Sequence, residues 1–299
     1  MGAESVGKES IVSAKQEGLR KVISAFRNVP FFPAIILVIF IFAGIFSGLL
    51  APHDPTKTQL RVALTPPMWQ EGGTADYPLG TDQMGRDELS RVMYGATISL
   101  RVCFIVVFAS GGIGTILALI SGYLGGWVDV LIMRLTDMML SLPYLLIAIT
   151  LAAVLGPSIN NIILVLSVIG WAQYTRVLHG EVLRVKEQDF VRLAVVAGAS
   201  RMRIMLKHIF PNIVNTLIIL GTLQLGTVII AEASLSFIGV GVPPPNPAWG
   251  SMLADGRQYV TYAWWLCVWP GLAIMLVVLA CNLLGDWLRV RLDPKFRQI

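Results

Sequence analysis

The sequence from Phe190 to Asn212 reads FVRLAVVAGASRMRIMLKHIFPN, and it separates two apolar runs. We call this stretch the basic elbow. Basic and apolar residues are interleaved along it, and Gly198 lies near its centre. Because Ala199 and Ser200 follow the glycine with short side chains, we expect a bend between two short helices. Pro211 comes just before the next apolar run, where the first turn of a helix tolerates a proline.

The chain around the elbow is unusually apolar. Apolar residues make up 55% of it and charged residues 14%, with a mean hydropathy of +0.71. Charges and turn residues divide it into about six runs, each roughly the 17–25 residues that a bilayer-spanning helix needs. The runs cover residues 32–51, 97–121, 138–155, 161–178, 213–235 and 262–284. We therefore predict an all-α membrane protein with about six transmembrane helices.

Lysine and arginine gather before the first run, in the basic elbow and after the last run, whereas residues 51–91 hold more acids than bases. Short cytoplasmic loops carry an excess of lysine and arginine. We therefore expect both termini and the elbow in the cytoplasm. The predicted parts are a cytoplasmic tail (1–31), a first transmembrane helix (32–51), an extracytoplasmic segment (52–92), and a core domain (93–299) with five transmembrane helices and a cytoplasmic loop at 180–212.

Several patterns typical of enzymes lack the residues that their chemistry needs. GAESVGK at 2–8 has the spacing of a phosphate-binding loop, but Glu9 stands where a serine or threonine should hold magnesium. Gly111, Gly112 and Gly114 lie inside an apolar run, where small residues favour close helix packing over dinucleotide binding.

The metal-binding residue types are scattered along the chain. Three cysteines fall within predicted spans, and three histidines lie far apart in the sequence: Cys103, Cys267, Cys281, His53, His179 and His208. We therefore predict no catalytic residue, no metal site, no disulfide framework and no cofactor bound by this chain, and we expect no nucleic-acid partner.

Charged residues in or beside the apolar runs are costly in lipid, so they must lie near a helix end or face protein. Asp129, Arg134 and Asp137 precede the third run, and we expect that helix to begin below the membrane. Arg101 and Glu232 lie near the outer ends of the second and fifth runs. Each either lines a polar pathway or reaches the membrane interface.

The residues of the basic elbow leave two interpretations open. A rigid, partly apolar and basic bend is suited to docking into a groove on a soluble partner. An amphipathic helix held on the membrane surface by anionic lipid has the same composition.

The elbow resembles the EAA loop of bacterial ABC-importer permeases, whose pattern is Glu-Ala-Ala, three residues, Gly, nine residues and Ile-x-Leu-Pro. Ala194, Gly198 and Pro211 match this pattern in register. Four positions depart from it: Arg192 replaces Glu, Leu193 replaces Ala, His208 replaces Ile and Phe210 replaces Leu. This resemblance favours docking to a partner ATPase, which we expect to carry an acid that compensates Arg192.

Other segments are similar to the second permease subunit of dipeptide and oligopeptide importers. They are LGTDQMGRDELSR (79–91), GYLGGWVD (122–129), ASLSFIG (233–239), PPPNPAWG (243–250), MLADG (252–256), NLLGD (282–286) and LDPK (292–295). Together they extend from about residue 79 to the C-terminus. The resemblance implies a type I ABC importer permease (MetI-like) fold and alternating access, and makes 93–299 the core permease domain.

The resemblance also implies partners: a homologous second permease, one or two cytoplasmic ATPases that bind ATP and magnesium, an extracytoplasmic solute-binding protein, and membrane lipid. The expected ATPase-coupling residues are Arg192, Leu193, Ala194, Gly198, Ala199, Ser200, Arg201, Arg203, Lys207 and Pro211. Asp82, Arg86, Asp87 and Arg91 lie on the outer approach to the second run. Pairing among them would fix where the helix starts, and contact with the binding protein is the alternative.

The cargo is left open between dipeptides or oligopeptides, glutathione and nickel complexes, because relatives with different cargo share these motifs. A stand-alone secondary transporter is the rival from another class, and it predicts paired intramembrane charges or broken helices, often in two matching halves. Neither feature is expected from this sequence. An intramembrane enzyme would need a catalytic constellation at one depth, and none can be assembled.

Overall fold

The computed structural model describes residues 30–292. The phosphate-loop-like pattern at 2–8 and nearly all of the predicted tail 1–31 lie outside the described residues, as does most of LDPK (292–295). The elements are α2 (Phe31–Ile45), α3 (Ser47–Leu50), the 3-10 helix η1 (Leu60–Val62), α4 (Glu88–Leu124), α5 (Gly126–Ser141), α6 (Tyr144–Leu155), α7 (Ile159–Lys186), α8 (Asp189–Val196), α9 (Arg201–Arg203), the π-helix η2 (Ile204–Ile209), α10 (Phe210–Ile238), α11 (Trp249–Gly256) and α12 (Trp265–Leu292).

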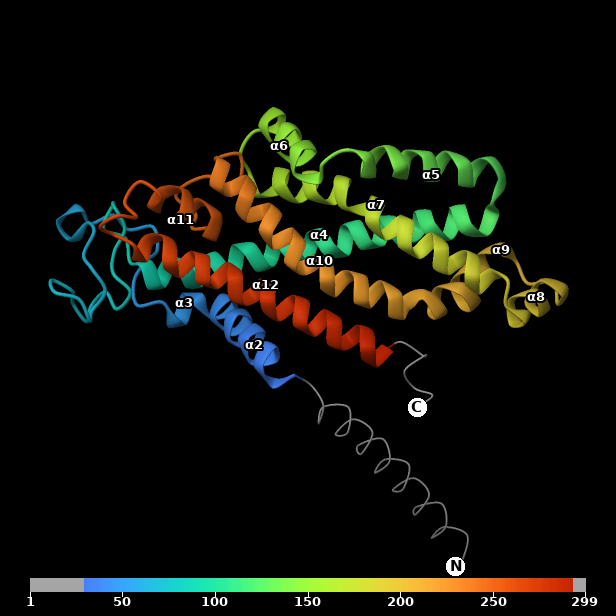
Figure 1. The fold of residues 1–299 in the computed structure, drawn as a ribbon, viewed down its shortest axis with the longest axis horizontal. Coiled ribbons are helices and arrows are strands. Elements are labelled where there is room, and N and C mark those ends of the chain that lie inside the picture. The colour runs from blue at the N-terminus through green and yellow to red at the C-terminus, as the bar shows by residue number, and fades with distance from the viewer. Residues whose placement is uncertain (1–29, 293–299) are drawn as a thin grey trace, which may run out of the picture.

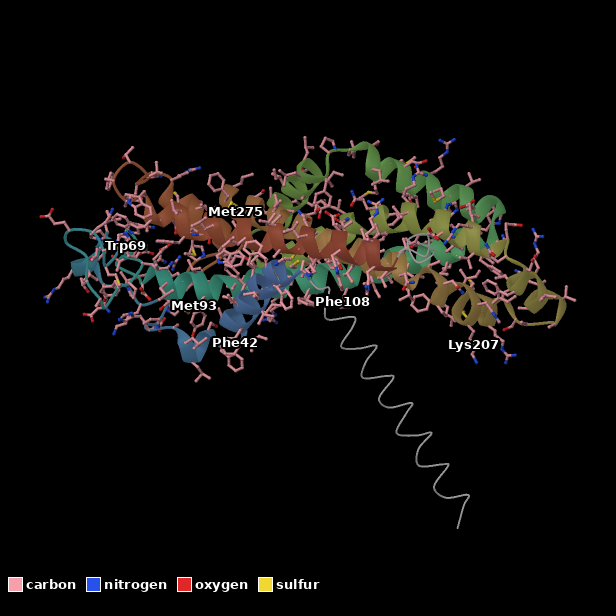
Figure 2. All side chains as sticks on the ribbon, turned by 60° about the horizontal axis from the view of Figure 1, so that its bottom comes forward. Phe42, Trp69, Met93, Phe108, Lys207 and Met275 are labelled. Atoms are coloured by element: carbon pink, nitrogen blue, oxygen red, sulfur yellow. The ribbon has the colours of Figure 1, made fainter. Side chains whose placement is uncertain are left out.

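The long helices α4, α7, α10 and α12 run along the long axis of the molecule (Figure 1). The loop before α4 and helix α11 lie at one end, and α8 and α9 lie at the other. Figure 2 shows apolar side chains such as Phe42, Phe108 and Met275 on the outside of the helices, where they are 52%, 71% and 53% exposed. A protein surface of this kind is stable when it faces lipid.

The described residues form an all-α fold with four or five candidate spans, fewer than the six predicted. Four helices are long and apolar enough to cross a membrane: α4, α7, the continuous helix Arg201–Ile238, and α12. The bent pair α5 and α6 supplies a fifth. The predicted first span, 32–51, is divided at Phe46 into α2 and α3. With 15 residues, α2 is about 22 Å long, which is shorter than the roughly 30 Å hydrocarbon core.

Glycines on α4 allow α7 to pack closely against it. A Cβ added at Gly114 would lie 2.7 Å from the Trp171 carbonyl oxygen, and one at Gly122 would lie 2.6 Å from the Val182 side chain. Real side chains do not approach this closely, so both positions require glycine. The prediction that Gly114 serves helix packing is confirmed, whereas Gly112 has nothing within 4 Å.

The third apolar run, 138–155, is not one continuous helix, and the expectation that no broken helix is present is wrong. Helices α5 and α6 meet at an angle of 89° around Leu142 and Pro143. A proline disfavours helical geometry in the residue before it, and Leu142 is extended, with φ −97° and ψ 144°. Two polar contacts join α5 to α7: Asp129 Oδ1 lies 2.8 Å from His179 Nε2, and Asp137 forms an ion pair with Arg176.

The second arm of the basic elbow also differs from the prediction. It is not a separate short helix, because residues Arg201–Ile238 form one helix of 38 residues. Pro211 lies in the first turn of α10, as expected, although the helix continues back from there through η2. The π-helix η2 precedes it, and the Phe210 amide bonds to the Met205 carbonyl five residues back. This wider winding accommodates a proline that cannot donate a hydrogen bond.

Candidate functional site

The bend of the basic elbow is built around Gly198, which has a φ of +75°. The Ala199 amide bonds to the Ala194 carbonyl oxygen and the Gly198 amide to that of Val195, both at 3.0 Å. These two bonds define a Schellman motif, which ends α8 with a left-handed residue. Ser200 then caps α9 by accepting a bond from the Arg203 amide. The bend is therefore specified by local backbone geometry.

Apolar residues anchor the elbow to the ends of α4 and α7. Val191, Ala194, Ile204 and Ile209 are buried, each at most 9% exposed. They belong to one cluster with residues from α4, α7 and α10: Ala118, Leu119, Tyr174, Leu178, Val182, Val185 and Ile213. Side chains that are packed this closely move together, so a force on the elbow is transmitted to the long helices.

The opposite face of the elbow is exposed and both apolar and basic. Leu193, Val196 and Met202 are 67%, 85% and 62% exposed. Arg192, Arg201, Arg203 and Lys207 are exposed around them, and Figure 2 shows Lys207 at the end of the molecule that carries the elbow. A groove of about 530 Å³ runs between α8 and the ends of α4 and α7. It is lined by Tyr123, Leu124, Lys186, Glu187, Val191, Arg192, Val195, Val196 and Arg201.

Arg192, which replaces the glutamate of the EAA pattern, has an acidic partner within this chain. Its guanidinium lies 2.6 Å from the Glu187 carboxylate, and both side chains are exposed. The hydrogen bond and the charge of Glu187 raise the pKa of Arg192. Nearby, Lys186 donates to the carbonyl oxygens of Gly122 and Tyr123 at 3.2 and 2.8 Å, and so caps the end of α4.

At the other end, charged residues fix the start of α4. Asp82 pairs with Arg86 at 2.6 Å and with Arg91 at 3.5 Å. Asp87 is the N-cap of α4 and accepts from the Ser90 amide at 3.0 Å. All four predicted residues are buried in this chain, at 1–5% exposure. Asp82, Arg86 and Arg91 form one cluster, in which Arg86 also reaches Asp255 at 3.6 Å, whereas the Asp87 side chain contacts Ser90 and His53.

Arg101 and Glu232 are not brought together. Arg101 is exposed on α4. Glu232 on α10 is 1% exposed, and its two oxygens accept from Ser99 at 2.9 Å and from Ser236 at 2.8 Å. These hydroxyl donors satisfy a buried acid and join α10 to α4.

A second cavity, of about 220 Å³, lies among α4, α5, α6, α7 and α10, and sequence reasoning missed it. Its lining is Ser110, Met139, Leu140, Leu142, Tyr144, Ile169, Gly170, Gln173, Tyr174, Gln224, Thr227 and Val228. The Gln224 carboxamide donates to the Gln173 carboxamide oxygen across it. The available signal was a glutamine inside each of two apolar runs, but the sequence does not show that these residues are neighbours.

Among residues 30–292, no group of three or more His, Cys, Asp or Glu residues is placed to hold a metal ion. Cys103 and Cys281 are buried and Cys267 is half-buried, and all three are unpaired.

Comparison with known proteins shows the family of this chain. Residues 114–298 match the family described as "Binding-protein-dependent transport system inner membrane component". The dipeptide transport system permease protein DppC of Escherichia coli (strain K12) is 47% identical over 264 residues, which cover 88% of each chain. The di/tripeptide transport system permease protein DppC of Pseudomonas aeruginosa (strain UCBPP-PA14) is 41% identical over 263 residues, covering 88% of this chain and 87% of that protein. The glutathione transport system permease protein GsiD of Escherichia coli O6:K15:H31 (strain 536 / UPEC) is 40% identical over 264 residues, covering 88% and 86%.

The chain therefore belongs to the family of inner membrane components of binding-protein-dependent transport systems. It is a permease subunit of the inner membrane, with several apolar transmembrane helices. ATP hydrolysis belongs to partner subunits, and a binding protein and a partner permease belong to the same kind of system. The predicted family is confirmed, and the stand-alone transporter and the intramembrane enzyme are excluded.

Proposed function

We propose that this chain forms half of an ATP-driven uptake pathway for dipeptides and longer peptides, together with a homologous second permease. Two of the relatives described above carry names that specify dipeptide or di/tripeptide transport. One or two cytoplasmic ATPases bind ATP and magnesium, and an extracytoplasmic solute-binding protein delivers the cargo. Lipid covers the apolar outer surface.

The observation that carries the proposal is the two-sided basic elbow. One face is packed into the cluster that joins α4, α7 and α10. The other face presents exposed apolar and basic side chains beside a groove. ATP hydrolysis on a separate subunit must reach the membrane through a mechanical link, and an elbow continuous with a long helix is suited to that role. The coupling residues are those given for the EAA-like pattern, from Arg192 to Pro211.

The proposed topology has six spans, with α2 and α3 together as the first. The basic elbow and both termini lie in the cytoplasm, and residues 52–92 lie outside. A cysteine-labelling experiment tests this arrangement. Leu206→Cys in the elbow and Met68→Cys in the outer loop replace side chains of similar exposure, 53% and 56%. A membrane-impermeant maleimide applied from outside should label only Met68→Cys, and labelling of Leu206→Cys would refute the orientation.

The outer charged cluster has a structural role in this proposal. Asp82, Arg86, Asp87 and Arg91 hold the loop against α4, so their removal should weaken binding-protein contact indirectly. Arg101 is the stronger candidate for the translocation pathway because it is exposed, whereas Glu232 is held by two serines.

Gentle purification from native membranes, followed by mass spectrometry, tests the assembly. We expect a second permease, one or two ATPases and a solute-binding protein. Uptake of a radiolabelled dipeptide by the reconstituted complex then tests the cargo, with unlabelled glutathione as competitor because one relative is named for glutathione transport. Recovery of the chain alone, or transport without ATP, would contradict the proposal. If glutathione competes for uptake and unlabelled dipeptides do not, the cargo would be glutathione rather than a dipeptide.

A further inference from the structure

The two cavity glutamines share one depth. Gln173 lies halfway along α7, and Gln224 lies halfway along α10. The two helices run in opposite directions, because the chain passes through the basic elbow between them. Their carboxamides are in hydrogen-bond contact. An amide at the middle of a membrane span is costly unless it has a polar partner. The pair is therefore a polar site within the predicted spans 161–178 and 213–235.

The lining of the cavity around the pair mixes polar and apolar residues and is uncharged. It contains no acidic, basic or histidine side chain among the described residues. Tyr174 lines the cavity and is only 2% exposed, and its hydroxyl lies beside that of Ser110, another lining residue.

The break between α5 and α6 meets the same cavity. Leu142 and Tyr144, on either side of Pro143, are among the lining residues. Helix α6 starts at Tyr144 without a side-chain cap. The Leu146 and Ile147 amides bond to the Pro143 carbonyl oxygen, which leaves the Tyr144 and Leu145 amides at the start without a partner within the helix. Broken helices of this kind occur in membranes where they line a polar cavity, and transporters use them to bind cargo.

We propose that this cavity is a cargo subsite that binds a peptide bond, with the carboxamides of Gln173 and Gln224 as its two partners. A carboxamide offers both a donor and an acceptor, and so it matches the N–H and C=O of a peptide bond. In the described state the two glutamines satisfy each other, and cargo replaces that bond. An uncharged site of this type binds the peptide backbone and does not discriminate among the side chains of the cargo. This inference rests on the proposed function, because it names the part of the peptide that the pathway recognises.

The test uses the complete transporter, reconstituted with its partner permease, ATPases and binding protein. The probes are radiolabelled alanyl-alanine and its analogue with an N-methylated peptide bond, which lacks the N–H. The variants are Gln173→Leu and Gln224→Leu, with the milder Gln224→Asn. The control is Thr222→Val on α10, because within residues 30–292 the Thr222 hydroxyl bonds only to the Ile218 carbonyl of its own helix. Basal ATPase activity and co-purification of the subunits show that each variant assembles.

The readout is the ratio of alanyl-alanine uptake to uptake of the analogue. The binding protein also discriminates between the two, but it is the same in every sample, so its contribution cancels between variants. In the described pair Gln173 supplies the acceptor oxygen and Gln224 the donor, so Gln173 should accept the peptide N–H and Gln224 should donate to the peptide C=O. We expect Gln173→Leu to lower this ratio about five-fold, as the loss of one hydrogen bond implies. Gln224→Leu should lower uptake of both probes equally, because both keep the C=O. Gln224→Asn should lower both less than Gln224→Leu, and Thr222→Val should change neither the ratio nor the uptake.

Two results would overturn the inference. If Gln173→Leu leaves the ratio at its wild-type value, or if Gln224→Leu transports both probes as well as the wild type, the glutamines only join two helices. If the wild-type complex shows no ATP-dependent uptake of alanyl-alanine, the proposed function fails first and this inference fails with it.

Discussion

Two substitutions at Gly198 test the backbone geometry of the basic elbow separately from its charge. The residue has a φ of +75°, and nothing lies within 4 Å of a Cβ added there. The cost of a side chain is therefore conformational, about 1–2 kcal/mol for most residues and less for Asn and Asp, which tolerate this region. Gly198→Asn and Gly198→Asp should both fold and assemble, and they differ by one negative charge.

That charge lies among Arg192, Arg201 and Arg203, on the face proposed to dock on the ATPase. A surface complementary to these arginines is acidic, and like charges brought together at an interface cost about 3 kcal/mol, or more than about 100-fold in affinity. We expect Gly198→Asp to abolish ATP-dependent uptake while the permease pair stays assembled, and Gly198→Asn to retain most uptake. The assay is uptake by the reconstituted complex, with subunit recovery measured by co-purification. Normal uptake by Gly198→Asp, or equal loss in both variants, would refute the reasoning.

Three further predictions concern stability and coupling. Gly114→Ala should lower the free energy of unfolding by about 1–3 kcal/mol, because its Cβ meets the α7 backbone, whereas Gly112→Ala, with open space around it, should not; equal melting temperatures for the two would contradict this packing. Glu232→Leu should cost about 1–3 kcal/mol, and more than Glu232→Gln, because the buried Ser99 and Ser236 hydroxyls lose their acceptor and Ser236 keeps only the bond from the Val242 amide; thermal unfolding in detergent measures both, and equal effects would refute the hydrogen-bond account. Lys186→Met should leave assembly intact but lower the ratio of uptake to ATP hydrolysis, because the end of α4 loses its cap beside the elbow; an unchanged ratio would count against a coupling role for this contact.

Composition was sufficient to predict the helical class, but it did not give the helix ends. The second apolar run begins at residue 97, whereas α4 begins at Glu88. Its first turns are buried by the outer loop and by α11 rather than by lipid, so Glu88 and Arg91 are tolerated there. Hydropathy measures suitability for lipid, and it does not recognise a helix end that is covered by protein.

The basic elbow could be located from sequence because its signals are local. Gly198, the short residues after it and the basic side chains all lie within a few positions of one another. The π-helix before Pro211 was not predictable in this way, because the pattern shows only that a proline is present. The Gln173–Gln224 pair was also out of reach, since it joins residues 51 positions apart and depends on how α7 packs against α10.

The unbroken helix from Arg201 to Ile238 has a mechanical consequence. Its 38 residues make a rod about 57 Å long. Near its middle the rod is held tightly against α12, where a Cβ at Gly285 would lie 2.7 Å from Leu223 and one at Gly226 would lie 3.0 Å from Asn282. A rod pivoting at such a fulcrum by about 10° displaces both ends by about 5 Å in opposite directions. The same tilt that draws the elbow end one way would push the Glu232 end the other way, so opening on one side of the membrane and closing on the other become a single movement.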